Sequence, residues 1–336
     1  MNNNKRKRQA RNPARWPLLL LSFLAIPNVT GTTAWAQGQP YPVKSVRTIV
    51  PFPAGGGADF IARITVQKLS EAMGQPFIVE NRAGASGNIA SELVARATPD
   101  GYTLLSSSST TVTAAVWTKT SFDVVRDFTH ISTTATSCLL IAIHPSVPAK
   151  TVKDLVILAK SKPGQISYAS SGAGTSPHLV GELLRQAAGV NFLHVPYKGA
   201  APTMTALLSG EIALALPNVA AGAPLVKAGR IRVLATTCPR RTKLMPDVPT
   251  IAEAGYPNVE FVTWWGLSAP AGTPRGIVDR LNQEITRIVQ SSEIERIFAK
   301  QGVDPKSMPV DELNSFVRSE SSRWQKVIKQ GSIDKN

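Results

Sequence analysis

Twelve consecutive residues, Tyr168 to Leu179 (YASSGAGTSPHL), concentrate groups that can bind or react with a ligand. They include two glycines, four serine or threonine hydroxyls, Pro177 and His178. A loop that enters a helix offers backbone N–H groups without intrahelical partners, and the helix dipole adds partial positive charge. Glycines let the backbone approach a ligand, and Pro177 at a first helical position removes an N–H that would lack a partner. This composition predicts an anion cradle, without identifying the anion.

Nucleotide binding and nucleophilic catalysis both lack their sequence patterns. The glycines of the stretch GGGAD (55–59) do not fit G-x-G-x-x-G, and no Gly-Lys-Ser/Thr ending is present. Asp59, near a predicted helix start, suits a helix cap better than a phosphate ligand. The stretch GASG (84–87) is one residue short of the G-x-S-x-G elbow of hydrolases. We therefore do not expect an enzyme.

A metal site is not predicted either. The four histidines form no H-x-H or H-x-x-x-H pair, and the chain has no C-x-x-C. His130, His144 and His194 lie in or beside apolar runs, where a hydrogen-bonded structural role is expected. His178 and Glu182 are four residues apart, so we expect a surface hydrogen bond between them. No metal and no organic cofactor is expected.

Short β-rich runs alternate with helical ones along the chain. The predicted strands are 46–50, 77–79, 102–105, 139–143, 166–169, 192–195, 212–216 and 231–236. The predicted helices are 61–73, 88–97, 179–187 and 277–289, the last of these being the last long helix. This alternation predicts an α/β fold with mostly parallel sheets. Ligands in such sheets bind beyond the carboxyl ends of strands, where loops 51–59, 106–111 and 170–177 are expected.

The first 36 residues are predicted to be an export signal that is removed. Six basic residues precede the apolar segment 16–26, and Ala34-Trp35-Ala36 fits a cleavage site before Gln37. The apolar segment has about half of the ~20 residues that a membrane span needs. The expected location is therefore the periplasm.

Removal of this signal leaves 31 basic and 22 acidic residues, a net charge of +9. The basic residues form no stripe interleaved with aromatic residues, so no nucleic-acid partner is expected. The positive field suits an anionic small ligand. The remaining length, about 300 residues, exceeds what one core usually organises and predicts two domains.

Two cysteines, Cys138 and Cys238, are present in a chain predicted to enter an oxidising compartment. They can be two buried thiols or one disulfide, and their spacing does not decide between these. If they are bonded, they close a loop of about 100 residues, which the chain-entropy model values at ~4.7 kcal/mol.

Six stretches of the chain follow one known pattern. They are VPFPAGGGADFIAR (50–63), VENRAGASGNIASELVARATPDGYTLL (79–105), YASSGAGTSPHLVGELL (168–184), HVPYKGAAPTMTALLSGEI (194–212), RVLATTCPRRTKLMPDVPTIAEAGYPN (232–258) and WWGLSAPAGTPRGIVDRLN (264–282). In this order they resemble the Bug-type extracytoplasmic receptors of tripartite tricarboxylate transporters. The resemblance implies a type II periplasmic binding protein fold: two α/β domains, joined by a two-strand hinge, close on a ligand in the cleft between them. Domain 1 would comprise 37–140 plus 238–336, and domain 2 would comprise 141–237.

The resemblance also implies where a ligand binds. Family receptors hold a carboxylate through backbone amides, hydroxyls and bridging waters, and His178 and Tyr197 would support or line the cleft. The residues assigned to the ligand site are Phe52, Pro53, Ala54, Gly55, Gly56, Gly57, Asp59, Ser107, Ser108, Thr110, Ser170, Ser171, Gly172, Ala173, Gly174, Thr175, Ser176, His178, Tyr197, Pro217, Asn218 and Trp264.

The hinge implied by this fold places the two cysteines near each other. Segments 139–143 and 231–236 would be adjacent antiparallel crossing strands, which places Cys138 and Cys238 at the same end of the ribbon. The resemblance thus makes a disulfide a hypothesis, with two free thiols as its alternative.

One stretch departs from the family pattern. Where relatives commonly read G-x-V-D-x-x-F-D-N, residues 210–218 read GEIALALPN, so Ala213 and Pro217 replace both acids. An acid at the second position could pair with a ligand's ammonium, which is costly to bury without a partner. We therefore expect a carboxylate ligand without an amine, with an aromatic or apolar body. Trp264 and Trp265 would pack against that body, or else lie in the core.

The resulting hypothesis is a periplasmic solute receptor, expected to be a monomer. Its expected partners are a small organic carboxylate and the integral-membrane permease subunits of a tripartite tricarboxylate-type transporter. Two alternatives remain: a periplasmic ligand sensor that acts on a signalling protein, and a hydrolase.

Overall fold

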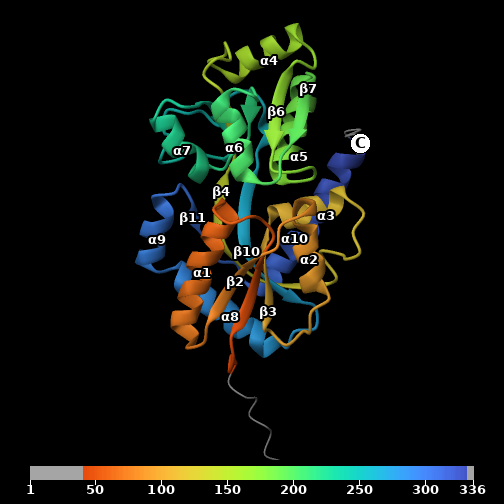
Figure 1. Cartoon of the computed structure of the whole chain (residues 1–336), viewed down its shortest axis with the longest axis vertical. Helices are drawn as coiled ribbons and strands as arrows, with labels where there is room; N and C mark the ends of the chain where they lie inside the picture. The colour runs from red at the N-terminus through yellow and green to blue at the C-terminus, as the bar shows by residue number, and fades with distance from the viewer. Residues whose placement is uncertain (1–40, 331–336) are drawn as a thin grey trace, which may run out of the picture. The chain divides into compact units, whose positions relative to one another are not determined.

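The computed structural model describes residues 41–330, which form two β-sheets with helices around each (Figure 1). The predicted export signal lies outside the described residues. The six-stranded sheet has the order β11 (Asp304–Pro305), β4 (Phe128–Cys138), β10 (Val262–Pro270), β3 (Thr103–Ser108), β1 (Val46–Val50) and β2 (Phe77–Asn81). The five-stranded sheet has the order β7 (Phe192–Pro196), β6 (Ile166–Ser170), β8 (Leu214–Ala215), β5 (Leu140–Ile143) and β9 (Arg232–Thr236).

We call the six-stranded sheet with its helices lobe 1, and the five-stranded sheet with its helices lobe 2. The helices of lobe 1 are α1 (Gly57–Met73), α2 (Asn88–Ala95), α3 (Ser109–Trp117), α8 (Arg275–Val289), α9 (Ser292–Ala299) and α10 (Val310–Gln330). The helices of lobe 2 are α4 (Val152–Ser161), α5 (Ser176–Ala188), α6 (Ala200–Ser209) and α7 (Val219–Lys227). Two short 3-10 helices, η1 (Ala85–Gly87) and η2 (Pro257–Val259), lie in connections.

The α/β class is confirmed, but the prediction of mostly parallel sheets is wrong. Strand β1 pairs in parallel with β2 and β3, and β6 pairs in parallel with β7 and β8. Strand β10 is antiparallel to both β3 and β4, and β5 is antiparallel to both β8 and β9. The chain passes directly from β4 of the six-stranded sheet into β5 of the five-stranded sheet. This crossing lacks the intervening helix of a βαβ unit, which keeps neighbouring strands parallel. Both sheets are therefore mixed.

The expectation that 277–289 is the last long helix is also wrong. Helix α8 occupies that segment, but α9 and the longer α10 follow it. Trp324 of α10 is fully buried and packs edge-on against Phe261, within a core cluster that also contains lobe 2 residues. No helix within residues 41–330 combines the length and the apolar character that a membrane span needs.

The crossing between the lobes has the predicted antiparallel pairing. Strands β5 and β9 are neighbours, with Leu140 opposite Thr236. One residue further on, Thr237 donates its N–H to the Leu139 carbonyl at 2.9 Å, and its hydroxyl donates to the Phe261 carbonyl at 2.6 Å. Cys138 and Cys238 are the next opposed pair, at the same end of the ribbon, and are joined by a disulfide, so the disulfide hypothesis is confirmed. The domain boundaries at residues 140 and 237 stay a prediction.

Candidate functional site

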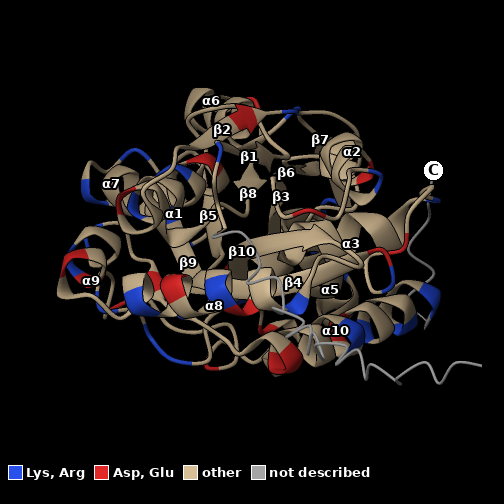
Figure 2. Cartoon of the chain, turned by 90° about the horizontal axis from the view of Figure 1, so that it is seen from below, with Lys and Arg blue, Asp and Glu red and all other residues tan. Residues whose placement is uncertain are grey.

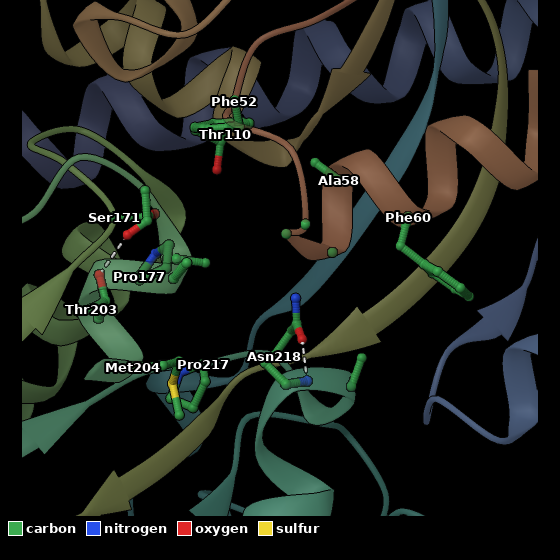
Figure 3. A pocket seen from close by; sticks show the side chains of 18 of the residues that line it. Phe52, Ala58, Phe60, Thr110, Ser171, Pro177, Thr203, Met204, Pro217 and Asn218 are labelled. Carbon is green, nitrogen blue, oxygen red and sulfur yellow. Dashed lines mark hydrogen bonds between the residues drawn. The ribbon is translucent and has the colours of Figure 1, made fainter. Parts of the chain in front are cut away.

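A cavity of about 380 Å³ is lined by residues of both lobes (Figure 3). The N-termini of five helices, α1, α3, α5, α6 and α7, contribute to its lining. This convergence follows from the chain order, because each of these helices begins soon after a strand whose carboxyl end faces the cavity. Each helix N-terminus carries the equivalent of about +0.5 charge, so the cavity is a site of positive potential.

Helix α1 begins on the cavity without a side-chain cap at Gly56. The loop before it is held by Asp59, which accepts hydrogen bonds from Gly55 N–H at 3.0 Å, from Arg63 at 2.9 Å and from Asn81 at 2.9 Å. These hydrogen bonds, despite the opposing effect of burial, lower the pKa of Asp59 and keep it ionised. Asp59 is buried and does not line the cavity, so it holds the loop in place rather than facing a ligand.

Asn218 caps helix α7 and lines the cavity. Its Oδ1 accepts the N–H of Ala221 at 2.9 Å, so its amide nitrogen is the end left for other partners. In Figure 3 that nitrogen points toward the start of α1. Asn218 therefore presents a donor, not an acceptor, on this side of the cavity.

The starts of α3 and α5 meet directly. Ser108 forms a capping box with Thr111 at the start of α3. The hydroxyls of Thr110 and Ser176 lie 3.1 Å apart, and Ser176 also donates to Ser109 at 3.2 Å. Hydroxyls of both lobes thus form one hydrogen-bonded cluster beside the cavity.

The loop between β6 and α5 is supported from beneath by two histidines. His178 Nδ1 accepts the N–H of Gly174 at 3.0 Å, and His194 Nε2 lies 2.7 Å from the Ser170 hydroxyl. The two imidazole rings stack with centroids 4.0 Å apart. Burial lowers the pKa of His178 to about 4 and, together with the neighbouring His178, lowers the pKa of His194 to about 3. Both rings are therefore neutral near pH 7 and act as positioning groups.

The cavity lining in the described part of the chain has Lys198 as its one charged side chain and contains no Asp or Glu. Elsewhere the charges are mixed: Figure 2 shows basic and acidic residues side by side on α8. Within residues 41–330 no group of three or more His, Cys, Asp or Glu side chains is arranged to hold a metal ion. The site is thus suited to an anion.

Twelve of the residues assigned from the sequence line the cavity: Phe52, Pro53, Ala54, Gly55, Gly56, Gly57, Ser108, Thr110, Ser171, Ser176, Pro217 and Asn218. The others lie outside the lining: Asp59, Ser107, Ser170, Gly172, Ala173, Gly174, Thr175, His178, Tyr197 and Trp264. Ser107 is fully buried and accepts a hydrogen bond from Ser268, and the Tyr197 hydroxyl donates to Glu211 at 2.6 Å. The expected His178–Glu182 hydrogen bond is absent; Glu182 is buried and bonds Tyr168 and Arg185 instead.

Trp265, not Trp264, lines the cavity. Adjacent residues of a strand point to opposite faces, and Trp264 belongs to a core cluster where it packs against Phe316. The first turn of α6 also lines the cavity, through Gly199, Ala200 and Ala201, which were not among the predicted site residues. These small residues carry no polar side chain. In the sequence, a Lys-Gly pair before a helical segment was the one indication of a helix start here.

Known proteins are similar to this chain in sequence and in architecture. A family model described as the tripartite tricarboxylate transporter family receptor, TctC, matches residues 61–333. BugT of Bordetella pertussis is 33% identical over 303 residues, which cover 89% of this chain and 93% of BugT.

Two solved structures of Rhodopseudomonas palustris proteins are also similar. One, solved with adipate, is 34% identical with a TM-score of 0.81, over 87% of this chain and 98% of that chain. The other, MatC with bound malate, is 30% identical with a TM-score of 0.81, over 86% of this chain and 100% of that chain. The chain therefore belongs to the TctC family of Bug-type solute-binding receptors and has the periplasmic binding protein fold.

Proposed function

We propose that this receptor captures a small carboxylate without a free amine in the periplasm and delivers it to the permease subunits of a tripartite tricarboxylate-type transporter. The observation that carries the proposal is the convergence of five helix N-termini on a cavity whose lining contains no carboxylate side chain. Two relatives were solved with adipate and with malate, which are carboxylates.

A carboxylate fits the donors that surround the cavity. Helices α1 and α6 begin there without side-chain caps, so their first N–H groups need partners from outside the helix. At the start of α5 the Ser176 N–H donates to Thr110 at 3.4 Å, and Pro177 has no N–H. The hydroxyl of Ser171 and the amide of Asn218 add donors from lobe 2. Hydrogen bonds to a charged acceptor in such a site are about twice as strong as neutral ones.

The same lining disfavours an ammonium group. A buried ammonium needs an anionic or strongly accepting partner. The charged side chain in the lining, Lys198, is positive and would repel an ammonium. Pro217 lines the cavity at a position where the sequence pattern of relatives carries an acid, and proline offers neither charge nor side-chain acceptor. The ligand is therefore a carboxylate whose body carries no positive charge.

The body of the ligand packs against apolar side chains. Phe52, Met204, Pro217 and Trp265 line the cavity, from both lobes. A volume of about 380 Å³ is near the lower end of cavities that hold small organic ligands. A short aliphatic chain or a single aromatic ring fits this description.

Ligand binding shifts the receptor toward the closed cleft, which is the form that the permease recognises. Contacts between the lobes already surround the cavity: a Cβ placed on Gly199 would lie 3.4 Å from Pro53.

Calorimetry with matched acid pairs tests the proposal. Glutarate and glutamate share one carbon skeleton and differ in the amine, as do succinate and aspartate. We expect the amine-free acid of each pair to bind at least tenfold more tightly, a difference of about 1.4 kcal/mol. Tighter binding of glutamate or aspartate contradicts the proposal.

A further inference from the structure

A strained connection in lobe 1 reaches across to lobe 2. Residues 81–87 (NRAGASG) lead from β2 into α2. Ala85 has φ 47° and Ser86 has φ 56°, and they are the only non-glycine residues within 41–330 with positive φ. Left-handed backbone is unfavourable for a residue with a Cβ and persists where the surroundings impose it.

The tip of this segment contacts the anion loop of lobe 2. The Ser86 hydroxyl donates to the Ala173 carbonyl at 2.7 Å. Gly172, with φ 135°, leaves room for this contact, because a Cβ there would lie 2.7 Å from Ser86 Oγ. Ala173 lies between Ser171 and Ser176, both of which line the cavity. The left-handed backbone at Ser86 thus accompanies a specific contact between the lobes.

The base of the same segment contacts the other wall of the cavity. Asn81 donates through Nδ2 to the Phe52 carbonyl at 2.9 Å and to Asp59 at 2.9 Å. A Cβ on Gly87 would lie 2.9 Å from Pro51 and 3.7 Å from the Phe52 ring. Since Phe52 lines the cavity, the segment touches a cavity wall in lobe 1 and a cavity loop in lobe 2.

We infer that residues 81–87 form a latch that holds the cleft closed, and that Ser86 sets ligand affinity without touching the ligand. The inference rests on the proposed function, since it concerns closure on a bound acid. Opening the cleft separates Ser86 from Ala173, so their hydrogen bond stabilises the closed form alone. The latch therefore slows ligand escape.

The test replaces Ser86 and measures binding kinetics by stopped-flow tryptophan fluorescence, with glutarate and hexanoate as probes. Ser86→Ala removes the hydroxyl, and Ser86→Gly removes it while also relieving the left-handed strain. Both should release the probe three- to tenfold faster than the wild-type chain, and neither should have a lower Tm without ligand. Ser161→Ala is the control, because the Ser161 hydroxyl bonds the Leu158 carbonyl within lobe 2 and contacts no residue of lobe 1 through that bond.

Wild-type dissociation rates in both Ser86 variants would overturn the latch. So would a loss of Tm without ligand in both, because that result indicates a role in folding rather than in closure. If neither acid binds the wild-type chain, the proposed function fails for these acids and the latch is judged by ligand-free small-angle scattering. A larger radius of gyration in Ser86→Gly than in the wild type then supports it, and equal values overturn it.

Discussion

Gly57 and Asn218 approach each other across the cavity so closely that a Cβ on Gly57 would lie 2.6 Å from the Asn218 amide nitrogen. Gly57 begins helix α1 of lobe 1, and Asn218 caps helix α7 of lobe 2. Because the Asn218 Oδ1 is committed to the Ala221 N–H, the amide nitrogen is the group that faces lobe 1. The pair brings two helix N-termini and one side-chain donor to the same point of the cleft.

Replacing Asn218 with Asp should weaken ligand binding without unfolding lobe 2. Aspartate also caps helices, so α7 keeps its cap, but the donor becomes a negative acceptor that repels a carboxylate. The loss of a hydrogen bond to a charged group is worth about 1.5–3 kcal/mol, so the Kd should rise at least about tenfold by calorimetry. Asn191→Asp, which makes the same change on the exposed surface of lobe 2, should leave the Kd unchanged. Equal affinity of the two variants would show that Asn218 does not face the ligand.

Replacing Gly57 with Ala should oppose closure of the cleft. The added methyl group has room within lobe 1 but collides with Asn218 when the lobes meet as they do here. We expect a weaker affinity and an unchanged Tm without ligand, with a radius of gyration that fails to decrease when ligand is added. Gly276→Ala is the matched control, because a Cβ there meets nothing within 4 Å. Compaction of the Gly57→Ala variant to the wild-type value would contradict this account.

Acid should destabilise the folded chain through its buried histidines. The pKa of His178 is lowered to about 4 and that of His194 to about 3, both below the ordinary value of 6.5. The unfolded chain therefore binds more protons between pH 6.5 and 4, and the free energy of unfolding falls as the pH drops through this range. Each histidine contributes at most about 1.4 kcal/mol per pH unit. Urea unfolding at pH 7, 6 and 5 measures the slope.

A variant separates His178 from the other titrating groups. Protonated His178 can no longer accept the Gly174 N–H, so acid also loosens the loop that helps to form the cavity. His178→Asn should reduce the dependence of the unfolding free energy on pH. If the unfolding free energy depends on pH equally in the wild type and in the His178 variant, His178 does not contribute to that dependence.

Reduction of the Cys138–Cys238 disulfide should lower the stability of the chain. The bond links the two crossing segments directly beside the Leu139–Thr237 hydrogen bonds. Opening a link across 100 residues frees the unfolded chain, and the loss of a native disulfide typically costs about 2–5 kcal/mol. The midpoint of denaturant unfolding should therefore fall when dithiothreitol is added. The Cys138→Ala, Cys238→Ala double variant should show no further response to the reductant, and an unchanged midpoint in the reduced wild type would contradict the prediction.

The sequence predicted those parts of the site that a local pattern marks. Loops 52–57 and 170–176 follow apolar strands, are rich in glycine and precede helices, and both contribute to the cavity lining. The antiparallel hinge pairing and the disulfide came from the family resemblance and are present in the structure. Loops at the ends of strands can thus be predicted as parts of the site from the sequence alone.

Features that depend on how distant segments pack could not be predicted from the sequence. Trp264 and Trp265 are neighbours of one type on one strand, and only the packing of that strand decides which of them faces the cavity. The start of α6 offers backbone groups alone, so no side chain marked it. Whether β10 runs with or against β3 depends on the course of the chain between the lobes, which local periodicity does not record.

The most direct test is native mass spectrometry of the receptor purified from the periplasm without unfolding, with the released ligand then identified. Our account predicts a bound organic acid that has a carboxylate and no amine, and that leaves more readily from the Asn218→Asp variant. An amino acid, a nucleotide or a tightly held metal ion in the cavity would contradict it.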